Sequence, residues 1–477
     1  MEKKMIKIKD LNFRYRDSGE FALKDINLEI GEGECICLTG ISGSGKSTLL
    51  MAVNGLIPHY VSGEMSGDVW LDGMNTKEVE ISRLAEKAGM VFQNPDTQIF
   101  ALSVRSEVAF GPENILTPPG EIYERLNRAL DAVDMGGFED RNPNELSYGQ
   151  KQRITLASVL SLAPRILLMD EPLSLMDCGG KERILDIISE LKEKGFTVVI
   201  GEHNLPFMLG VSDRILVMHG GEIIRDAVPG QINREDIRLF NEIGIRWGET
   251  GVTAEDELTP NFDKKFDRNK IIEIRNLTYT YPCGICALNN LSLDVYEGEF
   301  LGILGKNGSG KTTLLKAVVG LIHPGAGEVT TLGISPHPYG LFGKVGFLIQ
   351  DPEYQIFEET VFDEIAFSLK KLNLTEDEIQ KRVNRALEVT NMEDLRESDP
   401  LKLSFGQKHR VAFASLLALK PGVIILDDLT KGLDYGNLKQ ILDTLKIMQR
   451  KFNVTVIICT HDHEIIKKYV DRVVRIG

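Results

Sequence analysis

The sequence predicts an α/β fold that is built twice along the chain. A G-x-x-x-x-G-K-[ST] motif occurs at residues 40–47 and again at 305–312, each time between an apolar strand-like run and the start of a helical pattern. Shorter segments repeat in the same order, and the Gln-Ile-Phe of residues 98–100 returns at 355–357. Strand-like runs alternate with helical patterns in both halves. This alternation is typical of a mainly parallel sheet covered by helices.

Composition narrows the class of protein. The chain has 477 residues, of which 42% are hydrophobic and 26% charged, with a formal net charge of -15. That charge disfavours nucleic acid or a ribosome as the main partner, because phosphate neutralisation needs clustered Lys and Arg. No uninterrupted apolar run of about 18 residues occurs. We therefore expect a cytosolic protein that cannot cross a membrane by itself.

The six cysteines indicate a reducing compartment, since several lie in apolar runs. A C-x-x-C sequence at residues 283–286 could belong to a metal site, but no second cysteine pair or nearby histidine completes four ligands. We interpret it as two incidental thiols.

The repeats suggest three segments. We expect a first domain at residues 1–230, a linker at 231–269 and a second domain at 270–477. The linker is rich in Asp, Glu, Asn and Lys, with one short helical patch at 237–243. Helical spacing at 121–135 and 376–392 predicts a helical subdomain in each half.

The two glycine-rich loops predict a Mg²⁺-nucleotide as ligand. Glycines allow consecutive backbone N–H groups to converge on an anion, Lys46 and Lys311 add positive charge near the outer phosphates, and the next hydroxyl can bind Mg²⁺. The expected nucleotide-binding residues of these loops are Gly40, Ser42, Gly43, Ser44, Gly45, Lys46, Ser47, Thr48, Gly305, Asn307, Gly308, Ser309, Gly310, Lys311, Thr312 and Thr313.

Carboxylates and amides follow other apolar strands. Asp170 and Glu171 end one strand, and Asp427 and Asp428 end its repeat. We expect a strand that is buried on both faces to carry two acids at its tip only where they have a function. Binding of Mg²⁺ is such a function. Single glutamines, Gln93 and Gln350, follow strands at matching positions; their amides could reach the metal or the attacking water, or could make a simple strand-end hydrogen bond.

Each half also has a Ser and a Gly at the start of an apolar-periodic helix, at residues 146–153 and 403–410. Such a helix N-terminus binds anions. These segments resemble the signature motif of the ATP-binding cassette (ABC) ATPases, with Tyr148 and Phe405 where the family usually has glycine. If the backbone there needs a positive φ, a side chain adds strain.

The resemblance covers both halves and implies their fold and chemistry. It implies two tandem P-loop ABC nucleotide-binding domains, each with a RecA-like core, an antiparallel β subdomain and a helical signature subdomain, using ATP and Mg²⁺. Residues 173–177 and 429–434 resemble the family's D-loop. The implied signature and adenine-stacking residues are Ser147, Gly149, Gln150, Ser404, Gly406, Gln407, Tyr15 and Tyr281. The implied metal ligands are Ser47, Gln93, Asp170, Thr312, Gln350 and Asp427. The implied catalytic residues are Glu171, Asp428, His203, His461, Gln93 and Gln350.

The family's head-to-tail pairing implies two composite ATP sites within one chain. The signature at Ser404 would complete the Lys46 site, and the signature at Ser147 would complete the Lys311 site. Glu171 would orient or deprotonate the attacking water, whereas Asp428 is one methylene shorter. We expect the second half's own centre to be slower, although a small backbone shift could let Asp428 reach the water equally well.

Residues 93–112 and 350–357 resemble the ATPases of energy-coupling factor (ECF) transporters, which import vitamins and metal ions in prokaryotes. The implied partners are an integral membrane coupling subunit and a small substrate-binding membrane subunit, and the implied location is the cytoplasmic face of the cell membrane. The acids Asp96, Glu107, Glu353 and Glu364 could meet basic helices of the membrane subunit, or form a solvated face. The alternatives are a soluble tandem-cassette ATPase acting on ribosomes and the fused ATPase of a sugar importer.

Overall fold

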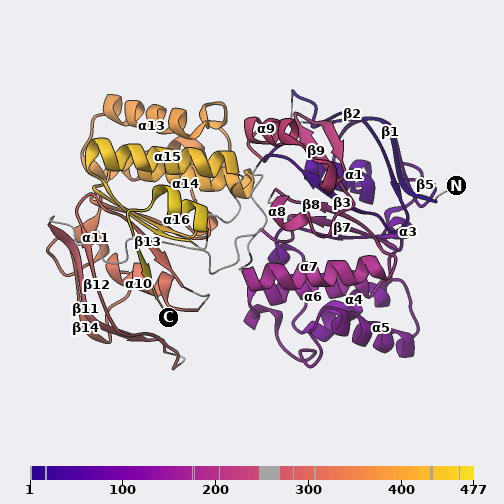
Figure 1. Cartoon of the computed structure of the whole chain (residues 1–477), viewed down its shortest axis with the longest axis horizontal. Helices are drawn as coiled ribbons and strands as arrows, with labels where there is room; N and C mark the ends of the chain where they lie inside the picture. The colour runs from indigo at the N-terminus through magenta and orange to yellow at the C-terminus, as the bar shows by residue number, and fades with distance from the viewer. Residues whose placement is uncertain are drawn as a thin grey trace. The chain divides into compact units, whose positions relative to one another are not determined.

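The computed structural model describes residues 3–16, 19–174, 176, 178–203, 205–245, 269–282, 284–305, 308–429, 433, 435–460 and 462–476. The described residues up to 245 belong to one compact unit, and nearly all of those from 269 onward belong to the second. Each unit contains two sheets and their covering helices, so the predicted α/β fold with a mainly parallel core sheet is confirmed (Figure 1).

The first unit has an antiparallel sheet and a mainly parallel one. The antiparallel sheet runs in the order β2-β1-β4-β5. Its strands are β1 (Lys4–Tyr15), β2 (Leu23–Gly31), β4 (Gly63–Leu71) and β5 (Met74–Asn75). The core sheet runs β10-β9-β3-β8-β7-β6, with only β10 antiparallel to its neighbour. Its strands are β3 (Cys35–Thr39), β6 (Ala88–Val91), β7 (Ile166–Asp170), β8 (Thr197–Gly201), β9 (Arg214–His219) and β10 (Glu222–Ala227).

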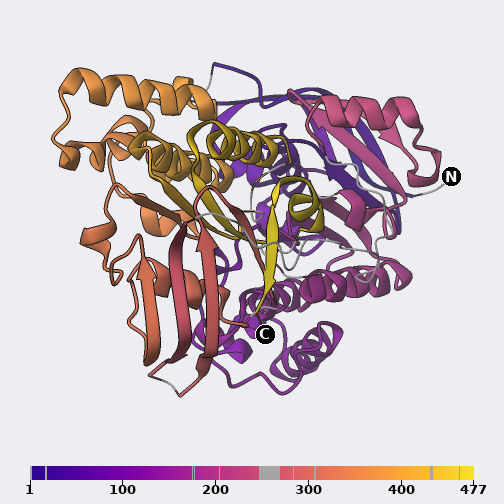
Figure 2. The ribbon, with the colours of Figure 1, turned by 60° about the vertical axis from the view of Figure 1, so that its left-hand side comes forward.

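The second unit repeats this plan with fewer strands. Its antiparallel sheet has the order β12-β11-β14, from β11 (Lys270–Thr280), β12 (Cys286–Tyr296) and β14 (Ala326–Thr331); these strands lie side by side in Figure 2. Its core sheet is parallel throughout, in the order β15-β16-β17-β13-β18. The strands are β13 (Phe300–Leu304), β15 (Val345–Leu348), β16 (Val423–Asp427), β17 (Thr455–Cys459) and β18 (Arg472–Arg475).

Helices cover both faces of each core sheet. In the first unit they are α1 (Lys46–Asn54), α2 (Leu56–His59), α3 (Ile81–Ala85), α4 (Val104–Asn114), α5 (Pro119–Ala132), α6 (Tyr148–Leu160), α7 (Cys178–Glu193), α8 (Leu205–Met208) and α9 (Arg234–Glu242). In the second they are α10 (Lys311–Val318), α11 (Pro338–Leu341), α12 (Val361–Phe367), α13 (Glu376–Thr390), α14 (Phe405–Leu419), α15 (Tyr435–Phe452) and α16 (His463–Tyr469).

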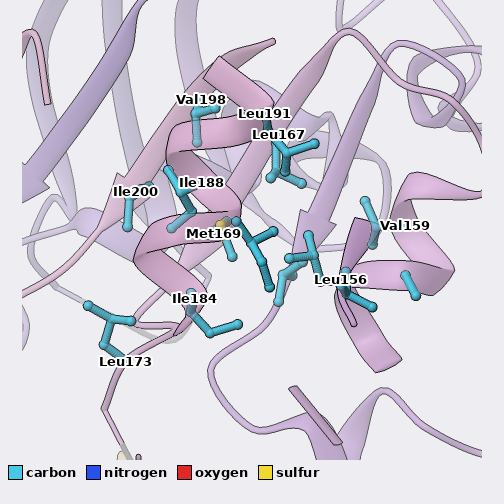
Figure 3. Close-up of a cluster of buried hydrophobic side chains, with 14 of the residues drawn as sticks. Leu156, Val159, Leu167, Met169, Leu173, Ile184, Ile188, Leu191, Val198 and Ile200 are labelled. Carbon is cyan, nitrogen blue, oxygen red and sulfur yellow. The ribbon is translucent and has the colours of Figure 1, made fainter. Parts of the chain in front are cut away.

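The apolar strands bury both faces. In β7, Leu167 and Met169 pack with Ile184 and Ile188 of α7, as Figure 3 shows, whereas the alternating Leu168 faces α1 and the antiparallel sheet. Strands buried in this way read as continuous hydrophobic runs, because successive side chains point to opposite faces. This is why β7 could be predicted as a core strand whose C-terminal end carries the acids.

The predicted helical subdomains are present. The helical spacing at 121–135 and 376–392 corresponds to α5 and α13. In α5, Leu126 and Leu130 are buried against α4 and α6, and in α13 Val383 and Leu387 are buried in the equivalent cluster. They pack against α6 and α14, whose first residues belong to the signature segments.

The helical patch inside the expected linker forms α9, which packs on the first unit. Phe240 is fully buried in that unit's core, and Asp236 pairs with Arg225 of β10 at 2.9 Å. Residues 246–268 of the expected linker lie outside the described residues.

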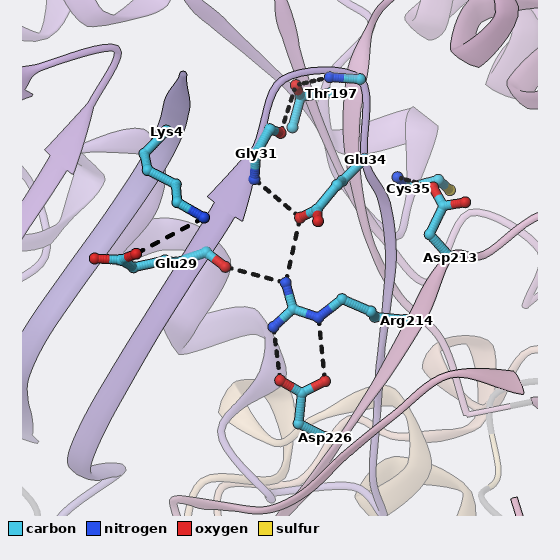
Figure 4. Close-up of polar contacts among 10 residues, drawn as sticks. Lys4, Glu29, Gly31, Glu34, Cys35, Thr197, Asp213, Arg214 and Asp226 are labelled. Atoms are coloured by element: carbon cyan, nitrogen blue, oxygen red, sulfur yellow. Dashed lines mark hydrogen bonds and ion pairs between the residues drawn. The ribbon is translucent and has the colours of Figure 1, made fainter. Parts of the chain in front are cut away.

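An arginine joins the two sheets of each unit. Arg214 of β9 donates to the Glu29 carbonyl at 3.1 Å and pairs with Glu34 and Asp226 at 3.2 and 2.6 Å (Figure 4). In the second unit, Arg472 of β18 donates to the Asp294 carbonyl at 2.6 Å and pairs with Glu299 at 2.5 Å. Glu299 is fully buried, whereas the side chain of Glu34 is 33% exposed. The same junction is therefore dry in one unit and partly solvated in the other.

We expect Glu299→Ala to destabilise the second unit by about 3 kcal/mol, because it leaves Arg472 buried without its carboxylate. Both tryptophans, Trp70 and Trp247, precede that unit in the chain. In urea unfolding of the full chain, the circular dichroism transition should shift while the tryptophan fluorescence transition stays in place. Glu34→Ala is the matched control and should cost under about 1 kcal/mol, since its pair is exposed and Asp226 remains. Equal shifts in the two variants would contradict this account.

Candidate functional site

The first glycine-rich loop connects β3 to α1 and folds around its own lysine. Lys46 is the first residue of α1 and is buried, and its Nζ donates to the carbonyls of Gly40 and Ile41 at 2.8 and 3.1 Å. Gly45 has φ 105°, and a Cβ there would lie 2.6 Å from the Ala22 carbonyl oxygen. Only glycine fits this position, so the loop's sequence fixes its close approach to the β1–β2 sheet.

The second loop has the same construction. Lys311 begins α10, and its Nζ donates to the Gly305 carbonyl at 2.7 Å. Gly310 has φ 90°, and a Cβ there would lie 2.3 Å from the Ala287 carbonyl oxygen. Of the residues predicted in this loop, Asn307 lies outside the described part of the chain.

A serine hydroxyl in each loop is buried and has no hydrogen-bond partner among the described residues. These hydroxyls belong to Ser44 and Ser309. A buried polar atom of this kind carries a desolvation cost that a ligand can offset. The position fits an oxygen-rich ligand.

The two tyrosines predicted upstream lie at the helices that follow the loops. The hydroxyl of Tyr15 lies 2.9 Å from Thr48 Oγ1, and that of Tyr281 lies 2.9 Å from Thr313 Oγ1. The contact repeats in both units and places each ring beside the glycine-rich loop. Their role in stacking on adenine stays a prediction.

The acid pair at the end of β7 combines burial with an unusual backbone. Asp170 is the last residue of β7 and is buried, and burial together with Glu171 raises the pKa of Asp170 to about 6. Glu171 has φ 45°, in the left-handed region that non-glycine residues rarely adopt. Its N–H donates to the Gly201 carbonyl at 2.7 Å, which holds this conformation. Strained backbone of this kind occurs often at functional sites.

Glu171 is the centre of a cluster drawn from four segments. Its carboxylate accepts a hydrogen bond from Gln93 Nε2 at 2.8 Å, and it lies 3.5 Å from His203 Nδ1 and 3.8 Å from Lys46 Nζ. Burial alone would raise the pKa of Glu171, but His203 and Lys46 outweigh it and hold the pKa at about 2. The same carboxylate raises the pKa of His203 against the opposing effect of burial. The structure thus brings together the predicted Lys46, Gln93, Glu171 and His203.

The second unit repeats the acid pair. Thr312 Oγ1 donates to Asp427 Oδ2 at 2.7 Å, which joins the glycine-rich loop's helix to the end of β16. Asp428 has φ 52°, and its N–H donates to the Cys459 carbonyl at 3.1 Å, as Glu171 does to Gly201. The predicted His461 lies outside the described residues.

The signature segments form capped helix starts. Ser147 and Ser404 are the N-caps of α6 and α14, and in each case the serine and the following glutamine, Gln150 or Gln407, form a reciprocal capping box. Tyr148 and Phe405 are the first helical residues and have no positive φ. The strain considered for these side chains is therefore absent, because helical backbone accepts any residue at this position.

Two acids considered for a partner surface have another function. Glu107 accepts the N–H groups of Phe100 and Ala101 at 3.1 and 2.9 Å, and Glu364 accepts those of Phe357 and Glu358 at 2.9 Å each. Glu107 and Glu364 are only 4% and 5% exposed. They order a loop from inside, so they are not available to a basic partner helix.

The other two acids are paired across the same loops. Asp96 lies 2.5 Å from Lys151 Nζ, and Glu353 lies 2.5 Å from Lys408 Nζ. Both pairs join the segment after a glutamine to the signature helix. The sequence signal was an acid three residues after Gln93 and after Gln350, together with a lysine in each signature helix, but no rule of spacing linked the acid to the lysine.

A metal site made of protein groups alone is not found in the part of the chain that the structure describes, where no three His, Cys, Asp or Glu side chains gather suitably. Ser47 hydrogen-bonds the Asp170 side chain. Oδ1 of the same side chain is buried and has no hydrogen-bond partner among the described residues. Each unit thus offers one hydroxyl and one carboxylate at the same place, which is an incomplete set of hard oxygen ligands.

A family model described as ABC transporter matches residues 23–174 and 288–431. The chain belongs to the ABC transporter family. Each match includes one glycine-rich loop and one strand that ends in paired acids. The family's ATP-binding cassettes hydrolyse ATP, so this tandem-cassette chain is an ATPase that binds ATP.

Relatives of this ABC chain share its tandem organisation. One from Caldanaerobacter subterraneus subsp. tengcongensis, provisionally named an ABC transporter ATP-binding protein, is 39% identical, over 98% of this chain and 89% of its own length. Similarly named relatives from Methanosarcina mazei and Vibrio parahaemolyticus are 35% and 36% identical, over 98% of this chain and 87% and 86% of their own lengths. A solved structure, cbiO1 from Clostridium perfringens, described as part of the ABC transporter complex cbiONQ, is 32% identical with a TM-score of 0.45, covering 50% of this chain and 96% of that one.

Among the described residues, no helix is long and apolar enough to cross a membrane.

We expect Glu171→Gln to lower ATP turnover by at least about 100-fold, because the amide cannot accept a proton from the attacking water. ATP binding should be retained, since Lys46 and the glycine-rich loop are unchanged. Turnover is measured by phosphate release and binding by a fluorescent ATP analogue. Turnover that equals that of the wild type would show that the other site dominates.

Asp428→Asn is the matched variant at the equivalent backbone position and should lower turnover less. The shorter Asp428 side chain reaches less far from a strand end with the same left-handed backbone. A loss larger than that of Glu171→Gln would reverse the ranking of the two centres.

Proposed function

We propose that this chain is the ATP-hydrolysing subunit of a prokaryotic ABC importer of the energy-coupling factor type, for a vitamin, a vitamin precursor or a metal ion. It would act as a peripheral protein on the cytoplasmic face of the cell membrane. Its partners would be an integral membrane coupling subunit and a small substrate-binding membrane subunit.

The observation that carries this proposal is an aromatic pair in the segment that follows Gln93 and in the segment that follows Gln350. Phe100 and Phe110 meet edge to face with ring centroids 4.6 Å apart, and Phe357 and Phe367 do so at 4.7 Å. Phe100 and Phe357 are 62% and 58% exposed, although their backbones are anchored by the buried Glu107 and Glu364. An exposed apolar residue on an anchored loop is typical of a docking surface.

The position of these pairs suits the coupling of a partner to hydrolysis. Phe100 of the first pair lies seven residues after Gln93 (100 − 93), and Gln93 contacts Glu171. A membrane subunit that binds Phe100 would therefore act on a segment that reaches the catalytic carboxylate. Glu107 and Glu364 are buried, and Asp96 and Glu353 are paired with lysines. The contact would therefore be mainly apolar.

The ATP sites are proposed to be composite. Lys46, Asp170, Glu171 and His203 would bind ATP with Ser404 and Gly406 of the other cassette, and the Lys311 site would use Ser147 and Gly149. Capped helix N-termini with N–H groups at their ends are suited to bind phosphate. Tyr15 and Tyr281 would stack on adenine.

Mg²⁺ would be held by Ser47, Asp170 and Gln93 in the first half, and by Thr312, Asp427 and Gln350 in the second. These oxygens are hard ligands of the kind Mg²⁺ prefers, and phosphate oxygens would complete the set. Bound Mg²⁺ supplies positive charge against the phosphates. Glu171, ionised at neutral pH, would take the proton of the attacking water, and His203 would hold positive charge near the terminal phosphate.

Detergent solubilisation followed by affinity purification of the tagged chain tests this proposal. We expect two integral membrane proteins to co-purify, one of them small. Stable sedimentation with ribosomes instead would favour the soluble alternative, which the net charge of -15 disfavours.

The aromatic pairs give a sharper test. Phe100→Ser combined with Phe357→Ser should reduce co-purification of the membrane subunits at least about tenfold, because exposed aromatic anchors dominate interfaces. ATP turnover of the isolated chain should stay unchanged. Tyr123→Ser is the control, since Tyr123 is 59% exposed on α5 in the same helical subdomain. Equal losses in the two variants would contradict docking at the pairs.

A further inference from the structure

Glu202 is a fully buried acid beside the cluster around Glu171. It follows β8 directly, and its N–H donates to the Leu38 carbonyl of β3 at 2.9 Å. One carboxylate oxygen, Oε1, accepts the backbone N–H of His203 at 2.9 Å and lies 3.4 Å from Nδ1 of the same histidine. A carboxylate buried this deeply loses its hydration, so a positive group beside it offsets a large cost. The imidazole of His203 is placed to be such a group.

Nδ1 of His203 lies between two carboxylates. It is 3.5 Å from Glu171 Oε2 and 3.4 Å from Glu202 Oε1. An imidazole nitrogen in this position keeps its proton, because both neighbours are negatively charged acceptors. Nε2 is then the ring nitrogen that would meet a phosphate. Glu202 therefore acts on the proton of His203 and on the orientation of its ring at the same time.

Charged groups face the His203 imidazole from the elements packed around it. They are Glu171 at the end of β7, Glu202 after β8 and Lys46 at the start of α1. Burial lowers the pKa of His203, the two carboxylates raise it and Lys46 lowers it, and the net direction is upward. The protonated imidazole thus persists to a higher pH than that of an ordinary histidine.

The second unit has a hydroxyl in place of this carboxylate. Thr460 follows β17 as Glu202 follows β8, and its N–H donates to the Ile303 carbonyl of β13 at 3.4 Å. Thr460 is also fully buried, and its Oγ1 accepts the N–H of Asp462 at 3.0 Å. The fold therefore accepts an uncharged side chain here, and the position does not by itself call for an acid. The charge of Glu202 is particular to the first unit.

We propose that Glu202 is a positioning residue that holds the His203 imidazole protonated and in place beside Glu171 during ATP hydrolysis. This inference rests on the role proposed for His203 near the terminal phosphate. Without the charge of Glu202, the protonated fraction of His203 falls at a lower pH, because one of the two carboxylates that stabilise it is lost. Turnover at the Glu171 centre is then lost at a lower pH as well.

Two measurements on the full-length chain test the proposal in Glu202→Gln, which keeps the size and an acceptor oxygen but removes the charge. One is the NMR titration of the His203 Cε1–H signal, identified by its absence in His203→Gln, and we expect its midpoint to move to lower pH. The other is ATP turnover, and we expect the rate at about pH 8.5 relative to that at about pH 6.5 to fall at least about threefold.

Two further variants complete the test. Glu202→Thr introduces the side chain that the second unit carries at this position, and it should move the midpoint and the ratio of rates in the same direction. Glu222→Gln is the control, since it makes the same chemical change at an exposed position of β10 and should alter neither.

The results that would overturn the proposal can be told apart. An unchanged His203 midpoint in Glu202→Gln would exclude the action of Glu202 and leave the role proposed for His203 intact. A lower midpoint with an unchanged ratio of rates would instead refute that role, and the inference with it. A purely structural role for Glu202 predicts an equal loss of turnover at both pH values together with a lower melting temperature, and this result would overturn the proposal too.

Discussion

The burial of Glu171 is the constraint on which the cluster at the end of β7 depends. A carboxylate at the tip of a strand that is covered on both faces loses most of its hydration, and this cost must be offset by charge and hydrogen bonds. Lys46, His203 and Gln93 provide them, and they come from the glycine-rich loop, the end of β8 and the loop after β6. One buried charge thereby draws three distant segments into one cluster.

The two halves share this design but differ in its details. Both have a left-handed residue after the aspartate that ends the strand, a lysine folded onto its own loop, and a tyrosine hydroxyl in contact with the helix that follows this loop. They differ in the length of the acid, in the hydroxyl at the start of the signature helix and in the exposure of the arginine junction. The two units therefore share the construction of the glycine-rich loop and differ in the groups around it.

Much of the fold could be predicted from the sequence because its signals are local. Continuous apolar runs such as β7 and β16 indicate strands buried on both faces, and the spacing in α5 and α13 indicates amphipathic helices. The residues that gather around Glu171 were also predictable as candidates, since each follows a strand whose C-terminal end lies at the same edge of the sheet. The roles expected of them came from the resemblance to a family.

The rest depended on contacts that sequence spacing does not encode. Glu107 looked like a surface acid of a helix, but its carboxylate turns inward to bind the backbone of Phe100. Tyr148 looked like a misfit in a glycine position, but its hydroxyl reaches a carbonyl 55 residues earlier. Long-range pairs of this kind can be recognised only when the packing of α4 and α6 against β6 is known.

The position of the Lys46 ammonium group has a consequence for ligand binding. Its hydrogen bonds to the carbonyls of Gly40 and Ile41 keep the loop folded around an internal cation. A ligand that takes up this cation has to replace both hydrogen bonds with bonds of its own. The protein itself therefore holds the loop in shape before any ligand arrives.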